Sequence, residues 1–271
     1  MKVEDCIVVV ERRSLGGCID LAFVFAREFA GPLFRLWALC AVPSCLTILL
    51  ISGWSTDLLP MSVLIFMFFS AVFNALLVCS MGPQVFGVPI SLTQAAKSWR
   101  KRLISWFFLT GISRVAQCIG FMFVTAYVGH LPEVLLLEQS KVNGVTSRLS
   151  WLCGGGGFGR NLGRVIGLTM FWAGLTLGLF SLIDFLSTVL LNYPIFSARL
   201  GSGSADSATV FAQLILDDAR VHFVFQLALW LPYPIIRLAW FFCYLDQRIR
   251  NECWDLQVQF RAEAARLEQL A

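Results

Sequence analysis

Three ionisable residues stand inside long apolar stretches of this sequence. Arg114, Asp184 and Arg237 interrupt runs of Leu, Phe, Val and Ile. A charged side chain at the centre of a bilayer costs about 2.5–3.5 kcal/mol on insertion scales, so it usually has a partner or faces a cavity. Asp184 paired with Arg114 or Arg237 would line a polar path for a substrate or a proton. The alternative, which we favour for Arg114 and Asp184, is a pair that only holds helices in register.

Arg237 has a third interpretation because of its position. It lies about two helical turns before the expected cytoplasmic end of its span. An arginine near a helix end can extend its guanidinium to the membrane surface while its methylene groups stay in the apolar region. We expect this arrangement for Arg237.

A glycine-rich segment, GGGGFG from Gly154 to Gly159, has the G-x-G-x-x-G spacing of dinucleotide-binding loops. The context of such a loop is missing, since no strand is expected before it and no Lys-Ser or Lys-Thr follows. We therefore expect a hinge between two helices. Arg160 and Arg164 follow directly, and their charges make them candidates for contacts with lipid phosphates.

Cysteines, histidines and acids show no catalytic or metal-binding spacing. The nine cysteines form no C-x-x-C pair and lie mostly in apolar runs, as small buried hydrophobic residues do. His130 and His222 have no ligand partner at a suitable spacing. Asp217 and Asp218 are adjacent, and neighbours on a helix point about 100° apart, which favours a helix cap over a catalytic pair. We expect no catalytic residue, metal, cofactor or enzymatic activity.

The composition is that of a membrane protein. Hydrophobic residues make up 58% of the 271 residues and charged residues 14%, against about 45–50% and about 25% in soluble domains. The mean hydropathy is +0.74. The apolar residues come in runs rather than at amphipathic spacing, so we expect one all-α integral membrane domain, a multi-pass helical bundle. The bilayer is its first expected partner, and no nucleic-acid partner is expected.

The polarity of the chain divides it into three parts. Residues 1–31 carry an apolar helical face and are expected to lie at the membrane interface. Residues 32–245 are expected to hold the membrane spans, and residues 246–271 to form a cytoplasmic tail helix with an apolar stripe. The clearest stretches of spanning length are Leu33–Ser52, Pro60–Gly82, Val165–Leu191 and Val221–Leu245. Prolines within these stretches are expected to kink the helices.

One apolar stretch, Leu103–Glu138, has 36 mostly apolar residues, interrupted by Arg114, Gln117 and His130. Basic residues precede it and follow it, and the positive-inside rule assigns both flanks to the cytoplasm. We expect two short crossings or a re-entrant hairpin that turns between Arg114 and Gly120. This gives about six membrane segments with both termini cytoplasmic. A single crossing, and hence five segments, is the alternative.

The start of the tail resembles the ending of a known family. The sequence YLDQRIRNECWDLQ is similar to the Tyr-x-Asp-x-Arg-x-Arg-x-Glu-x-x-Asp-Leu motif of bacterial six-span membrane proteins, which include the membrane domain attached to some glycerophosphodiester phosphodiesterases. Cys253 stands where the family usually has Gly. A second segment, LLLEQSKVNGVTSRLSWLCGG, is similar to the family's apolar run, its Glu and its short helix. The matching tail positions are Tyr244, Asp246, Arg248, Arg250, Glu252, Asp255 and Leu256.

The resemblance implies a six-span architecture with a cytoplasmic tail, in a family whose members mostly have no known function. No polar stretch has room for the phosphodiesterase barrel, so no hydrolase activity is carried over. We expect a non-enzymatic scaffold or accessory subunit of the bacterial inner membrane. Its partners would be anionic lipid headgroups and another protein bound through the tail helix. The alternative is a small transporter or permease component with a polar path near Asp184 and Arg114.

Overall fold

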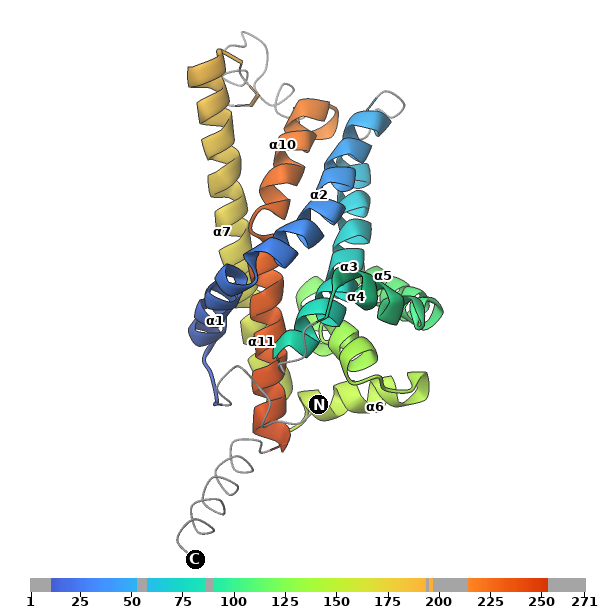
Figure 1. The fold of residues 1–271 in the computed structure, drawn as a ribbon. Helices are drawn as coiled ribbons and strands as arrows, with labels where there is room; N and C mark the ends of the chain where they lie inside the picture. The colour runs from blue at the N-terminus through green and yellow to red at the C-terminus, as the bar shows by residue number, and fades with distance from the viewer. Residues whose placement is uncertain (1–10, 53–57, 86–89, 194, 197–213, 253–271) are drawn as a thin grey trace, which may run out of the picture. The chain divides into compact units, whose positions relative to one another are not determined.

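The computed structural model describes residues 11–52, 58–85, 90–193, 195–196 and 214–252, and within these ranges every regular element is helical (Figure 1). The expected all-α fold is therefore confirmed for this part of the chain. Asp255 and most of the expected tail helix lie outside it. The helices are α1 Leu15–Glu28, α2 Ala30–Ile51, α3 Leu58–Val85, α4 Leu92–Arg100, α5 Leu103–Val128, η2 Glu133–Leu137, α6 Val142–Cys153, α7 Gly157–Leu191, α10 Ala219–Trp230 and α11 Tyr233–Glu252.

Several helices begin at side chains that bind free backbone N–H groups. The Ser14 hydroxyl accepts from Gly17 N at the start of α1. Ser91 and Gln94 form a reciprocal capping box at α4. The carboxylate of Asp218 accepts from two backbone N–H groups at the start of α10, so the predicted cap is confirmed at Asp218.

Five candidate spans are long and apolar enough to cross a membrane: α2, α3, α5, α7 and the combined stretch Ala219–Glu252. α2 has 22 residues, about 33 Å at ~1.5 Å per residue, which matches a hydrocarbon core of about 30 Å. The predicted span Leu33–Ser52 coincides with α2, and the predicted span Val221–Leu245 lies within Ala219–Glu252. The chain thus has the helices of a multi-pass membrane protein.

The chain forms two compact units, and each is described separately. Unit 1 contains the described parts of residues 1–33, 74–168 and 235–271, and unit 2 those of residues 34–73 and 169–234. Four of the long helices have residues in both units.

In unit 1, side chains of α11 contact α1 and the residue that follows α5. Phe242 packs edge-on against Phe25 of α1, with ring centroids 5.6 Å apart. The indole N–H of Trp240 donates to Gly129 O at 3.0 Å, and a Cβ on Gly129 would lie 2.7 Å from the Trp240 ring. Only glycine therefore fits at position 129 without displacing that ring.

The stretch from α5 to η2 closes on itself as a hairpin within unit 1. Gly120 interrupts α5 with non-helical angles, φ −143° and ψ 59°, at the end of the range in which the sequence predicts a turn. Residues 103–119 and 121–137 are arms of equal length, each about 25 Å if fully helical. At the base, the Arg102 guanidinium donates to the carbonyls of Leu135, Gln139 and Ser140 at 3.2, 2.7 and 2.7 Å. The chain therefore returns to the place where α5 begins.

In unit 2, the predicted proline kink is confirmed as a break between α10 and α11. Pro234 has no N–H, so it cannot donate to the carbonyl four residues earlier, that of Trp230. The indole N–H of Trp37 donates to this carbonyl at 2.8 Å. Trp230 in turn donates to the Ser44 hydroxyl at 3.0 Å. A side chain of α2 thus supplies the hydrogen bond that Pro234 removes from the backbone.

Candidate functional site

The charged residues on and around α11 in unit 1 form two clusters and one separate pair. Positions four apart on a helix share a face, so Tyr244, Arg248 and Glu252 form one row, while Asp246 and Arg250 form another. We call the first group, with Glu138 and Arg148, the Glu138 cluster. The Asp246 cluster consists of Arg13, Arg164, Asp246, Gln247 and Arg250.

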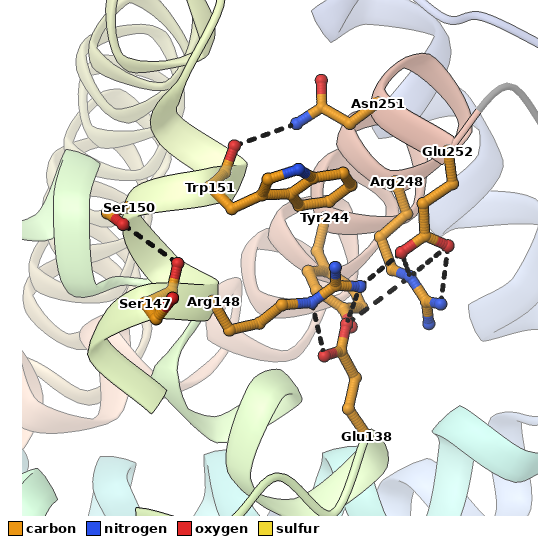
Figure 2. A network of polar contacts seen from close by, with 9 residues as sticks. All are labelled: Glu138, Ser147, Arg148, Ser150, Trp151, Tyr244, Arg248, Asn251 and Glu252. Atoms are coloured by element: carbon orange, nitrogen blue, oxygen red, sulfur yellow. Dashed lines mark hydrogen bonds and ion pairs between the residues drawn. The ribbon is translucent and has the colours of Figure 1, made fainter. Parts of the chain in front are cut away.

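The Glu138 cluster joins three segments that are distant in sequence (Figure 2). Arg148 of α6 binds Glu138 through two bonds, Nε to Oε2 at 2.8 Å and Nη2 to Oε1 at 2.9 Å, and it also pairs with Glu252. The Tyr244 hydroxyl donates to Glu138 Oε1 at 2.6 Å. Arg248 binds Glu252 with Nη2 2.7 Å from Oε2. The two arginines and two glutamates leave the Glu138 cluster without net charge.

This arrangement favours a structural role over acid–base chemistry. Burial of the Arg148 guanidinium opposes its charge, yet hydrogen bonds to Glu138 and Glu252 raise the pKa of Arg148 above its ordinary value. The guanidinium also lies over the Trp151 ring, 4.4 Å from its centroid. The cation therefore stays charged at every physiological pH and orders α6 against α11.

The Asp246 cluster fastens the N-terminal end of α1 and the start of α7 to α11. Asp246, which is 1% exposed, accepts from Arg13 N at 2.7 Å and Arg250 Nε at 2.8 Å. It also pairs with Arg164, which donates further to Cys243 O and to Gln247 Oε1 at 3.1 and 3.2 Å. Each oxygen of the carboxylate thus has a donor.

A third site, which sequence analysis missed, is the buried pair of Glu133 and Arg237. Glu133 is 0% exposed and Arg237 5%, so the prediction that Arg237 extends to the membrane surface is wrong. Glu133 Oε2 and Arg237 Nε and Nη1 have no hydrogen-bond partner among the described residues. Glu133 interrupts the apolar run HLPEVLLL, the same signal by which Asp184 was found.

His130 lies beside this pair and stacks on Trp240, with ring centroids 4.3 Å apart. Both ring nitrogens of His130 are buried and have no hydrogen-bond partner among the described residues.

The predicted polar residues Arg114 and Asp184 have contacts within their own units. Arg114 Nη1 donates to Gln117 Oε1 at 3.3 Å in α5 of unit 1. Asp184 is buried in α7 of unit 2, where its Oδ1 accepts from Phe196 N at 2.8 Å. The pairing of the two residues stays a prediction.

The glycine-rich segment forms the turn between α6 and α7. Gly155 and Gly156 have φ values of 57° and 80°, which favour glycine. Beyond the turn, Arg160 is exposed and its contact with lipid phosphates stays a prediction. The guanidinium of Arg164, by contrast, is buried against Asp246 inside the protein.

Among the described residues, no three His, Cys, Asp or Glu side chains are placed to hold a metal ion. Comparisons with family models, curated proteins and solved structures found no match to this chain. The five candidate spans place the chain in the class of multi-pass helical membrane proteins. The two segments that carry the family resemblance meet in space, because Glu138 and Arg148 of one bind Tyr244 and Glu252 of the other.

Proposed function

We propose that this protein is a non-enzymatic scaffold or accessory subunit of the bacterial inner membrane, with both termini in the cytoplasm. The proposal rests on how the charged groups at one end of α11 are bound. The Glu138 and Asp246 clusters bind these groups to each other and thereby fasten α1, α6 and the start of α7 to one helix. A fixed end of this kind suits the presentation of a surface to another protein.

The closed hairpin of α5 and η2 supports the six-segment topology within this proposal. Arg102 binds the carbonyls of residues 135, 139 and 140, so the chain enters and leaves the hairpin at one place. A stretch that returns to its starting side adds an even number of segments. This keeps the basic residues before and after it on the same side of the membrane, as the positive-inside rule requires.

Site-specific photocrosslinking tests the scaffold proposal. A photoreactive phenylalanine analogue at Asn143, on the exposed surface of α6, is expected to give one protein adduct of constant mass in living cells. The control is the same analogue at Leu190, an exposed apolar residue of α7. We expect Arg148→Gln to abolish the adduct, because this change releases α6 from α11. A monomeric chain without an adduct at Asn143 would overturn the proposal.

A second candidate, a small transporter component, is favoured by the Glu133 and Arg237 pair. Unpartnered polar atoms at a buried ion pair, together with a helix interrupted at Gly120, are features of substrate or proton sites in transporters. The variant Glu133→Gln distinguishes the two candidate functions. This change would abolish the flux of a transporter and would leave the adduct of a scaffold in place.

A further inference from the structure

The outer face of the α5 hairpin is a continuous apolar stripe. Ile104, Phe108, Ile112, Val115 and Ile119 follow one another at spacings of four, four, three and four, which place them on one helical face. All five are well exposed, up to 89% at Ile119. The stripe runs the whole length of the first arm, about 25 Å, so the surrounding hydrocarbon is its natural neighbour.

Four exposed basic residues surround the base of this hairpin. Lys97, Arg100 and Lys101 lie on the last turn of α4 and directly after it. Lys141 follows Ser140, whose carbonyl binds the Arg102 guanidinium, so the end of α4 and the start of α6 lie within one arginine side chain of each other. We call Lys97, Arg100, Lys101 and Lys141 the basic collar.

Among the residues that the structure describes, no acid forms an ion pair with the basic collar. The sequence contains no Asp or Glu from residue 58 to residue 132. The next two acids in the sequence are already bound, Glu133 to Arg237 and Glu138 to Arg148. A group of four like charges therefore stands at the point where an apolar stripe begins.

Two tryptophans lie at the base of the hairpin, beside the basic collar. The rings of Trp99 and Trp106 meet edge to face, 4.9 Å between centroids, across the turn between α4 and α5. Tryptophan is enriched at the level of lipid headgroups. The basic collar, the tryptophan pair and the start of the apolar stripe thus adjoin at this edge of unit 1, as headgroups, interface and acyl chains adjoin in a lipid leaflet.

We propose that the basic collar binds the phosphate headgroups of anionic phospholipids in the leaflet that receives the α5 hairpin. Lysine and arginine side chains next to a negatively charged leaflet each strengthen binding by about five-fold. The site differs from the predicted contact at Arg160, which follows the glycine turn. The inference is independent of the scaffold proposal, since it requires a membrane and no protein partner.

Native mass spectrometry of the full chain in detergent tests the proposal. Phosphatidylglycerol and phosphatidylcholine are titrated separately, and the apparent Kd of the first bound lipid is measured. The variant K97Q/R100Q/K101Q/K141Q is expected to bind phosphatidylglycerol at least about ten-fold more weakly than the wild type, with unchanged binding of phosphatidylcholine. Raising the salt concentration should weaken only the phosphatidylglycerol complex.

A matched control removes the same charge elsewhere. Arg12, Arg27, Arg35 and Arg220 are exposed and lie outside the basic collar, so R12Q/R27Q/R35Q/R220Q should retain the wild-type affinity. The variant K97R/K101R/K141R keeps all four charges and should bind as the wild type does, which separates loss of charge from loss of fold. Equal affinity of the wild type for both lipids, or loss of affinity only in the control variant, would overturn the proposal.

Discussion

Replacing Arg237 with leucine is expected to lower the free energy of unfolding by about 3–5 kcal/mol, because Glu133 would remain as a buried charge without its partner. Glu133→Gln should cost less, since a neutral amide leaves only Arg237 uncompensated and can itself accept a hydrogen bond from it. The measurement is unfolding in mixed micelles at neutral pH, followed by circular dichroism.

The double variant Glu133→Gln/Arg237→Leu tests whether the cost comes from the unpaired charge. We expect it to be more stable than Arg237→Leu alone, since replacing both partners removes the uncompensated carboxylate. Arg27→Leu is the control for an exposed arginine and should change stability by less than about 0.5 kcal/mol. A double variant no more stable than Arg237→Leu would show that the pair contributes little and that the lost packing dominates.

The second large effect is expected at Asp246. Asp246→Asn removes the carboxylate that the buried Arg164 and the N–H of Arg13 share, so we again expect a loss of about 3–5 kcal/mol. The N-terminal end of α1 should also loosen. Limited trypsin digestion after Arg12 and Arg13, followed by mass spectrometry, measures this release directly.

Arg250 supplies the matched comparison for Asp246. Its pair with Asp246 is an i, i+4 contact, and its side chain is 27% exposed, so Arg250→Gln should cost no more than about 1 kcal/mol. The double variant Asp246→Asn/Arg164→Met should recover part of the loss. Equal costs for Asp246→Asn and Arg250→Gln would contradict the assignment of Arg164 as the principal partner.

The long helices were predictable because hydropathy and helix caps are local signals. The α2 span, the start of α1 at Ser14 and the break at Pro232 and Pro234 each depend on residues within one or two turns. The closure of the α5 hairpin at its base was harder to predict from the sequence. Its closure depends on Arg102 reaching carbonyls more than thirty residues away, and such a contact leaves no periodic trace in the sequence.

The charge pairs were hardest to predict because pairing is a tertiary property. The motif residues of the tail were identified, yet their spacing does not show that Glu138 and Arg148 come between Tyr244 and Glu252. Arg237 was misplaced for the same reason. Its distance from the helix end favoured the membrane surface, and only the position of Glu133 explains why the side chain turns inward.

The bond from Trp37 to the carbonyl of Trp230 has an evolutionary consequence. The indole replaces the donor that Pro234 lacks, so the benefit of each residue depends on the other. In a chain with alanine at position 234, the backbone would regain its own donor and the tryptophan at position 37 would lose its polar role. We therefore expect selection to act on these two residues jointly, so that related chains that lose the proline are free to lose the tryptophan as well.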